Sequence, residues 1–213
     1  MPRHSAEQKT YLSILFGGIR EKVTKDTPGA VPRVNKNNDE VWERVDKSLE
    51  GKLVDIFYKE HHEYGNSYEI VIDDGDEKFN LSLHEDSKYA IQFLSRFPNI
   101  NLKEFITIVP YEFTPADSDK KRSGLNIFQG DNKIADYFRV KEGENWIHRD
   151  GFPEPEAVMD KKKWKKYSIE VQEFLYEYFK THIKPILTEE SVKSHEYFPE
   201  KPEEKEEDDD LPF

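Results

Sequence analysis

The stretch YEIVIDDGDEKFNLSLH, residues 68–84, decides the fold that the sequence predicts. Apolar residues alternate with others along residues 68–73 and again along residues 79–84, which is the pattern of two strands with one buried face. The intervening DDGD, residues 73–76, is a turn signal, because glycine and aspartate tolerate the backbone angles of tight turns. The preceding KLVDIFYKEH, residues 52–61, is rich in β-branched and aromatic residues and predicts another strand. These three strands form a predicted meander.

A helix and further strands follow the meander. Apolar residues recur at helical spacing between Ala90 and Phe97, with Asp86 or Ser87 as the N-cap and Pro98 as the stop. Strand signals return at residues 104–113, 125–129 and 134–138, the last two flank a turn at 130–132, and residues 145–155 are predicted to be irregular. One helix between a third and a fourth strand is the element order of the OB-fold, a five-stranded Greek-key barrel. We therefore expect a mainly β, OB-fold-like domain with helices.

The last predicted element is an amphipathic helix that begins at Lys163 and ends at Pro185. We interpret its apolar stripe as packing against the sheet; the stripe consists of Trp164, Tyr167, Val171, Phe174, Leu175, Tyr178 and Phe179. Beyond Thr188 the chain is polar, acidic and contains prolines, which predicts disorder. The predicted organisation is one domain at residues 1–187 and a disordered acidic tail at residues 188–213.

Charge is segregated along the 213 residues. The formal net charge is -12, which by itself argues against binding to nucleic acid. Nine acidic residues and two lysines at residues 196–213 give the tail a net charge of -7. In contrast, residues 118–141 carry a local charge of +3, and KKKWKK at residues 161–166 carries +5. An acidic protein with this distribution can still present a basic groove.

The sequence also bears on the compartment. There are no cysteines, which fits a reducing environment and excludes disulfides and thiolate chemistry. No apolar run approaches the roughly 20 residues that cross a bilayer, and the N-terminal segment is too polar for a signal peptide. We expect a cytoplasmic protein without membrane association.

No motif of an enzyme or of a metal site stands out. His61 and His62 are adjacent on a predicted strand and therefore point to opposite faces. The aspartates around Gly75 lack the twelve-residue ligand pattern of a calcium loop, and a hairpin turn explains them. No Gly-rich phosphate loop or nucleophile elbow is present. We predict a non-enzymatic protein without catalytic residues, metal or cofactor; a metal nuclease built from dispersed carboxylates stays an alternative.

Basic residues are interleaved with aromatic ones on the predicted strands and loops. Proteins hold single strands in this way: cations follow the phosphates, and unpaired bases stack on rings for about 1–3 kcal/mol each. About half of the rings must belong to the core, because alternation turns one face of each strand inward. Phe16 and Phe113 belong to the same pattern. The residues predicted to contact single-stranded DNA are Arg20, Lys22, Tyr58, Lys59, Tyr64, Tyr111, Lys120, Lys121, Arg122, Phe128, Lys133 and Arg139.

The C-terminal sequence EEDDDLPF carries a resemblance to a known family. It resembles the C-terminal tip of bacterial single-stranded DNA-binding proteins (SSB), which usually end in Asp-Asp-Asp-Ile-Pro-Phe. Phage single-stranded DNA-binding proteins also end in acidic tails with a terminal phenylalanine, and the segments 124–129, 137–138 and 152–155 are similar to segments of theirs. The core is longer than in the bacterial family and the long Gly/Gln/Pro-rich linker is absent, so the bacterial tetramer is not implied. The residues of the tip are Asp208, Asp209, Asp210, Leu211, Pro212 and Phe213.

The resemblance implies a phage-type SSB that coats single-stranded DNA non-specifically during DNA replication, recombination or repair. In that family the tip recruits partners, here a polymerase, a helicase or primase, or a recombinase or nuclease. Phe213 would enter an apolar pocket of the partner, and the aspartates would steer the tip toward basic surfaces. The same tail could lie in the protein's own basic groove when DNA is absent. Two other interpretations stay open: a tail that only aids solubility, and an acidic DNA-mimic inhibitor of a host DNA-processing enzyme.

Overall fold

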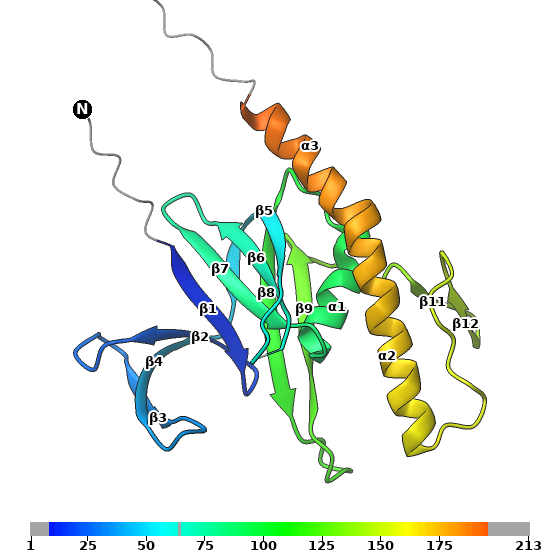
Figure 1. Ribbon diagram of the computed structural model, residues 1–213, viewed down its shortest axis with the longest axis horizontal. Coiled ribbons are helices and arrows are strands. Elements are labelled where there is room, and N and C mark those ends of the chain that lie inside the picture. The colour runs from blue at the N-terminus through cyan, green and yellow to red at the C-terminus, as the bar shows by residue number, and fades with distance from the viewer. Residues whose placement is uncertain (1–8, 64, 196–213) are drawn as a thin grey trace, which may run out of the picture.

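The structure is a computed structural model that describes residues 9–63 and 65–195. The protein is mainly β, as predicted, with a large sheet, a separate hairpin, and helices along one side of the sheet (Figure 1). The strands are β1 (Thr10–Leu15), β2 (Gly18–Val23), β3 (Val31–Val34), β4 (Glu40–Asp46), β5 (Leu49–Lys59), β6 (Ser67–Asp73), β7 (Lys78–His84), β8 (Phe105–Phe113), β9 (Arg122–Gln129), β10 (Asn132–Lys133), β11 (Arg139–Glu142) and β12 (Asn145–His148). The helices are α1 (Lys88–Arg96), the 3-10 turn η1 (Phe97–Asn99), α2 (Lys161–Tyr178), the π-helix η2 (Phe179–Ile183) and α3 (Lys184–His195).

The predicted meander forms the middle of a ten-stranded sheet. β5, β6 and β7 are antiparallel neighbours, and Ile70 of β6 lies opposite both Ile56 of β5 and Leu81 of β7. β8 pairs with the other side of β5, β9 pairs with β8, and β1 pairs in parallel with β7. The strand order across the sheet is β10-β9-β8-β5-β6-β7-β1-β2-β4-β3.

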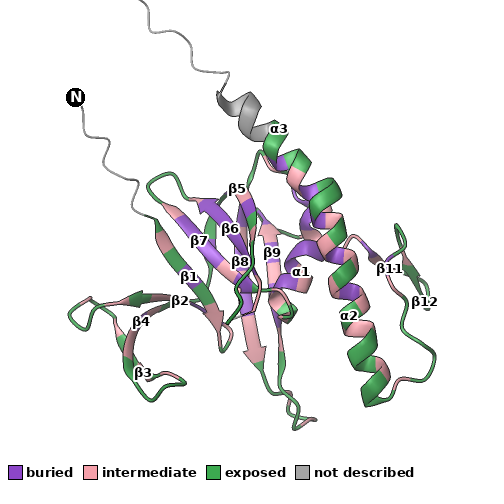
Figure 2. Cartoon of the chain, viewed as in Figure 1, coloured by how far each residue is buried: buried purple, intermediate pink, exposed green. Residues whose placement is uncertain are grey.

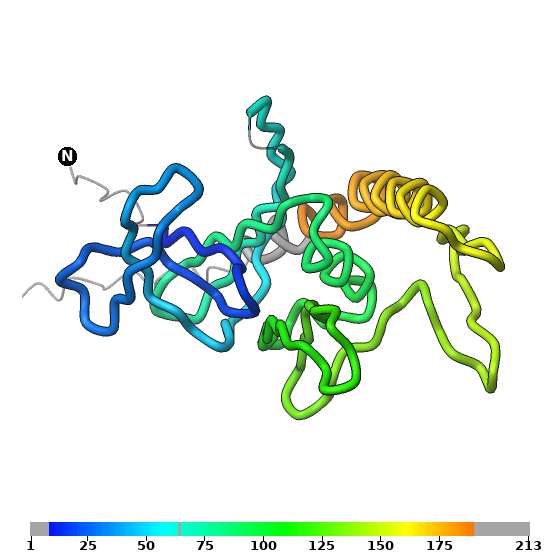
Figure 3. The backbone as a smooth tube through the Cα atoms, turned by 90° about the horizontal axis from the view of Figure 1, so that it is seen from below, coloured from blue at the N-terminus to red at the C-terminus, as the bar shows by residue number. Residues whose placement is uncertain are grey.

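Beyond β1 the sheet continues as a three-stranded antiparallel wing, which consists of β2, β4 and β3. Figure 3 shows the wing at one end of the molecule and α2 at the other, with the β8–β9 hairpin between them. β3 is a four-residue edge strand that contains Pro32, and the opposite edge, β10, has only two residues. The sequence does not predict the strands of the wing, so the sheet extends beyond the predicted strands.

The core lies between the sheet, α1 and the C-terminal helices, and Figure 2 shows buried segments in β6, β7 and α1. Ile70, Leu81 and Ile108 of the sheet and Phe93 of α1 are fully buried. α1 begins where one of the two predicted N-caps lies: the Ser87 hydroxyl accepts a hydrogen bond from the backbone N–H of Ala90 at 3.1 Å. The apolar spacing of this segment therefore produced a helix that closes the core.

The central strand β6 differs from the prediction that one face of the meander is open. Every residue of β6 from Ser67 to Ile72 is buried. On the second face Ser67, Glu69 and Val71 are buried, and the longer Phe57 lies opposite Glu69 in the strand register. The alternation correctly predicts the strands, but a pattern within one strand does not show whether its second face is also buried.

The C-terminal helix is longer than predicted. Pro185 does not end it. The π-helix η2, whose wider turn takes one residue more than a turn of α-helix, lies just before the proline, and the chain continues as α3 to His195. The boundary predicted between residues 187 and 188 therefore falls inside α3. The apolar stripe packs as predicted at Val171 and Leu175, but Trp164 is exposed. Within the described residues, no helix combines the length and the apolar character that crossing a bilayer requires.

Two predictions between β10 and α2 are wrong. Residues 134–138 do not form a strand, because Phe138 leaves the sheet to fill an aromatic cluster with Phe152 and Phe174. Residues 145–155 are not wholly irregular, because their first part pairs as β12 with β11 in a small hairpin. In both places contacts distant in sequence outweigh the local pattern.

Candidate nucleic-acid interface

Three of the predicted DNA-contacting residues share one face of the sheet. Ser13 of β1 lies opposite Arg20 of β2 and next to Ser82 of β7. Residues paired across strands point to the same face, and residues two apart on one strand do so as well. Arg20, Lys22 and, through β6, Lys59 of β5 therefore lie on this face, which we call the outer sheet face.

Exposed aromatic rings stand on the outer sheet face beside these cations. Tyr11 is exposed, and the Lys59 ammonium lies 5.8 Å from the centre of its ring. Between the tall side chains the floor is made of small polar residues, including Ser67 and Ser82, which line a cavity of about 230 Å³. Glu69 also lines this cavity, 3.9 Å from the Lys59 ammonium. This part of the face is a shallow groove with a cation and a ring at its side.

The tight turn between β1 and β2 displays Phe16 at the end of the outer sheet face. Phe16 and Gly17 both have positive φ, 53° and 70°, and the Phe16 side chain is 60% exposed. The turn is held against β8: a Cβ atom on Gly17 would lie only 2.4 Å from the backbone nitrogen of Glu112, so only glycine fits. A non-glycine residue with positive φ costs free energy and clusters at functional sites. The fold therefore holds a large ring in solvent on a strained turn.

Two cations flank the Phe16 ring. The Arg20 guanidinium carbon lies 5.5 Å from the ring centre and the Lys121 ammonium lies 6.0 Å from it. Arg20 comes from β2, whereas Lys121 comes from the loop between β8 and β9, so residues a hundred positions apart meet at this ring. A cation over an aromatic face attracts it by about 0.5–1 kcal/mol at an exposed site.

The end of the β8–β9 hairpin extends this cluster. The rings of Tyr111 and Phe113 lie 6.0 Å apart, and Phe113 is opposite Arg122 in the strand register. Lys121 also pairs with Glu112 at 2.8 Å. Lys120 is exposed in the adjoining loop. Arg20 and Lys121 thus lie beside Phe16, and three more predicted residues, Tyr111, Lys120 and Arg122, lie on the adjoining hairpin. We call these five residues and Phe16 the Phe16 cluster.

A buried carboxylate organises the basic residues of the wing. Glu43 accepts a hydrogen bond from Arg20 at 2.7 Å and another from Arg33 at 2.8 Å. The hydrogen bond from Arg33 lowers the pKa of Glu43, although burial opposes this, and the same contact raises the pKa of Arg33. Glu43 therefore stays charged and fixes both guanidinium groups on the outer sheet face.

Basic residues lie on the outer sheet face despite the acidic sequence. They include Arg20, Lys22, Arg33 and Lys59, and Lys184 of α3 lies 4.6 Å from the centre of the Phe57 ring. The carboxylates Asp55, Glu43 and Glu69 are each within 4 Å of one of these cations.

The remaining predicted residues lie elsewhere. Tyr58 points to the other side of the sheet, where its ring packs on Tyr68 and Tyr176 and its hydroxyl donates to Glu85 at 2.5 Å. Burial, followed by this hydrogen bond, raises the pKa of Tyr58, and the geometry gives it a role in packing. Phe128 and Lys133 face each other at the β9–β10 edge, away from Phe16, and Arg139 pairs with Asp136 near α2. Tyr64 and residues 208–213 lie outside the described residues.

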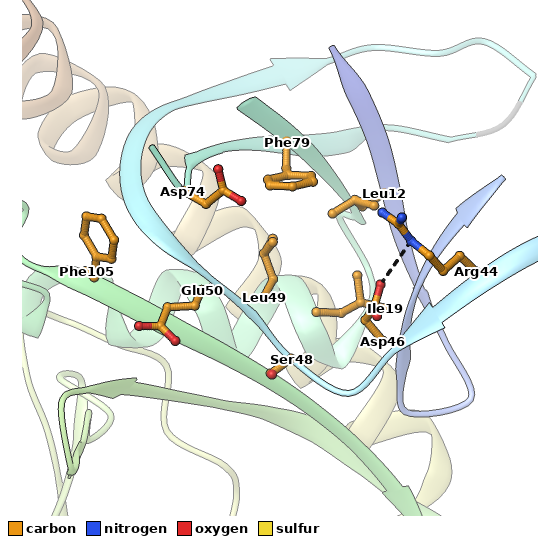
Figure 4. Close-up of a pocket in the computed structure, with 10 residues that line it drawn as sticks. All are labelled: Leu12, Ile19, Arg44, Asp46, Ser48, Leu49, Glu50, Asp74, Phe79 and Phe105. Carbon is orange, nitrogen blue, oxygen red and sulfur yellow. Dashed lines mark ion pairs between the residues drawn. The ribbon is translucent and has the colours of Figure 1, made fainter. Parts of the chain in front are cut away.

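The largest cavity among those described here has the opposite character. It has a volume of about 460 Å³ and a floor of Leu12, Ile19 and Leu49. Figure 4 shows Asp46, Glu50 and Asp74 around this floor, with Arg44 paired to Asp46 at 3.7 Å. Carboxylates repel phosphates, so this cavity is a poor place for a nucleic-acid backbone.

The sequence pattern includes Phe16, but Phe16 is not among the residues predicted to contact DNA. Arg33 and Glu43 are not predicted at all. The sequence signal for Phe16 is its position directly before Gly17 and Gly18, which is typical of a tight turn between two strands. A side chain in such a turn does not belong to the buried face of either strand. No sequence signal identifies Glu43 as the partner of two arginines, because that pairing follows from the strand register.

Among the described residues, no group of three or more histidine, aspartate or glutamate side chains could hold a metal ion. No protein-family model, no curated protein and no solved structure matches this chain.

Proposed function

We propose that this protein binds single-stranded DNA without sequence preference in the cytoplasm, during replication, recombination or repair. The observation that carries the proposal is the Phe16 ring, held in solvent on a strained turn with the Arg20 and Lys121 cations 5.5 Å and 6.0 Å from its centre. An exposed ring beside cations suits an unpaired nucleotide, whose base stacks while its phosphates meet the cations. In a duplex the bases are already stacked on each other and are not available to the ring.

The topology supports an OB-fold-like core within the larger sheet. The order β9-β8-β5-β6-β7, with α1 between β7 and β8, is the strand order of an OB-fold opened between its third and fifth strands. In this protein β1 occupies the free side of β7, and its turn reaches β8 at Glu112. OB-folds bind single strands on the face of their second and third strands and at the loop before the fifth strand. The outer sheet face and the β8–β9 loop correspond to these positions.

The acidic C-terminal sequence supports a second part of the proposal, the recruitment of replication and repair proteins. Its nine carboxylates are complementary to basic surfaces, and the LPF at residues 211–213 offers an aromatic ring to a partner's pocket. A tail with only a solubilising role needs no apolar end. We propose that this tip, residues 208–213, docks on such partners.

The test is a titration of fluorescently labelled oligonucleotide, single- and double-stranded, with and without magnesium, followed by anisotropy. We expect preferential binding of the single strand, no cleavage, and an affinity that falls steeply with salt because cations displace counterions from phosphates. Replacing Phe16 by alanine removes one stacking ring, for which we expect a loss of about 1–3 kcal/mol, or roughly five- to a hundredfold in affinity. The fold should survive, because the ring is mostly in solvent.

Phe105→Ala is the matched control. Phe105 is a phenylalanine of the same sheet with similar exposure, 49%, but it lies beside the acidic cavity. Its removal should leave the affinity unchanged. Equal losses for both variants, or no binding by the wild type, would refute the proposed interface. Failure to bind DNA combined with inhibition of a DNA-processing enzyme would favour the DNA-mimic alternative, and magnesium-dependent cleavage would favour a nuclease.

A further inference from the structure

A pocket between α1 and α2 lies beside the proposed interface and is not yet assigned to it. It has a volume of about 260 Å³. One wall is aromatic: Trp164 and Tyr167 have ring centres 5.9 Å apart, and Trp164 is 53% exposed although it belongs to the apolar stripe of α2. Such exposure leaves the indole face available to a flat ligand.

The polar groups of the pocket suit a nucleotide. Gln92 and Ser168 line it with an amide and a hydroxyl, which can meet the edge of a base. The Gln92 side-chain oxygen already accepts the backbone N–H of Leu125 at 2.6 Å, so the amide is fixed with its N–H₂ group left over as the donor. Lys88 and Arg139 supply positive charge at the same pocket, although Arg139 shares its charge with Asp136 at 2.6 Å.

The pocket adjoins the Phe16 cluster at Gly124. A Cβ atom on Gly124 would lie 2.4 Å from the Tyr111 hydroxyl and 2.6 Å from the Gln92 side-chain oxygen, so these two groups meet above one glycine. Tyr111 belongs to the Phe16 cluster and Gln92 belongs to the pocket. A strand that leaves Phe16 along Tyr111 therefore reaches the pocket without crossing the acidic cavity.

The basic start of α2 continues the positive charge beyond the pocket. Of its five lysines, Lys163 pairs with Glu156 and Lys166 pairs with Glu170. In the described part of the chain, no ion pair involves the other three, Lys161, Lys162 and Lys165, and all three are exposed. Exposed lysines without a carboxylate partner can neutralise phosphates, which releases the counterions condensed on a nucleic-acid backbone.

We infer that the α1–α2 pocket binds one nucleotide of the single strand, with its base stacked on Trp164, and that the strand continues over the lysines of α2. The inference rests on the proposed function and extends the binding site from the Phe16 cluster to the far side of α1. The segment KKKWKK is then part of the binding site and not only the first turns of a packed helix.

The test uses the full chain with Trp164 as its single tryptophan, in the variant Trp42→Phe/Trp146→Phe. Its emission is followed while a 30-nucleotide oligothymidine is added, and anisotropy of a labelled copy reports binding independently. We expect the emission to be quenched along the same saturation curve as the anisotropy, because a stacked base quenches indole fluorescence.

Alanine variants give the second measurement. Trp164→Ala should weaken binding of the oligonucleotide roughly five- to a hundredfold, whereas Trp146→Ala, which removes a similarly exposed indole on β12, should not change it. Replacing Lys161, Lys162 and Lys165 together by glutamine should reduce the slope of log affinity against log salt by about 2, since each phosphate contact contributes about 0.7 for a single strand. Circular dichroism verifies that each variant is folded.

The outcomes separate this inference from the proposed function. Oligonucleotide binding that weakens in Phe16→Ala but leaves Trp164 emission and the Trp164→Ala affinity unchanged would overturn the pocket assignment alone. Quenching by the octapeptide EEDDDLPF but not by the oligonucleotide would assign the pocket to the acidic tail instead. Absence of any oligonucleotide binding would overturn both.

Discussion

Replacing Glu43 by glutamine should destabilise the protein because it breaks a buried ion cluster at one of its three members. Glu43 is buried and bonds Arg20 and Arg33. Removing one partner of a buried pair costs about 3–5 kcal/mol, because the remaining charge is left uncompensated. The Arg20 and Arg33 side chains keep 15% and 30% of their surface in water, which relieves part of this cost. We therefore expect a loss of about 2–3 kcal/mol in the free energy of unfolding.

The stabilisation by the Glu43 carboxylate should decrease as the pH falls below about 4.5. The folded-state pKa of Glu43 lies below its ordinary value of 4.5. The stabilisation by the carboxylate is thus fully present above pH 4.5 and is lost as the pH falls through the lowered folded-state pKa. The difference between wild type and Glu43→Gln should stay constant from pH 7 to about pH 5 and shrink at lower pH.

Urea denaturation at several pH values measures this difference, and thermal unfolding should show a decrease in Tm of about 4–12 °C for a chain of this size. Glu170→Gln is the control, because its ion pair with Lys166 on α2 is exposed and should contribute well under 1 kcal/mol. Equal stability of Glu43→Gln and wild type at pH 7, or a difference that grows in acid, would refute the reasoning. Since Glu43 competes with phosphate for Arg20, the same variant should bind single-stranded DNA more tightly if the proposed function is correct.

Two further changes test the elements that position the interface and close the core. Gly17→Ala should destabilise by about 2 kcal/mol or more, from the positive φ and the approach to the Glu112 backbone. Gly29→Ala, at a positive φ with open space around it, should cost only about 1 kcal/mol, and equal losses in urea denaturation would contradict the close contact at Gly17. Ser87→Ala should cost about 1 kcal/mol, because it removes the cap of the Ala90 N–H, and unchanged thermal stability would show that the cap contributes nothing.

The sequence predicted the elements whose residues interact with near neighbours. The meander, the N-cap at Ser87 and the packing of Val171 and Leu175 all follow from spacing within one strand or helix, and the structure has them. The wing was not predicted, because its strands are short and highly charged, and their pairing depends on partners up to 27 residues away. Phe138 and Pro185 were misjudged for a related reason: an aromatic cluster and a π-helix outweigh the local pattern at these residues.

The sequence indicated which residue types form the candidate interface but not where they lie in the fold. Interleaved rings and cations indicated the residue types, and two of the twelve predicted residues, Arg20 and Lys121, lie beside Phe16, with three more on the adjoining hairpin. Tyr58 shows the limit, because alternation does not reveal which face of a strand is covered by a later helix, here through Tyr176. The Glu43 cluster depends on three strands in register, which no single stretch of sequence encodes.

The two edges of the ten-stranded sheet have a consequence for crowded copies of this protein. An exposed edge strand is a template on which another chain can form a shared sheet and aggregate. Pro32 removes a backbone donor from β3, and β10 offers only two residues, one of them Lys133. On that side β10 covers Phe128 and Gln129 of β9, and the Gln92 side chain takes the backbone N–H of Leu125. Both ends of the sheet therefore offer a neighbouring copy few regularly spaced backbone groups on which to add a strand.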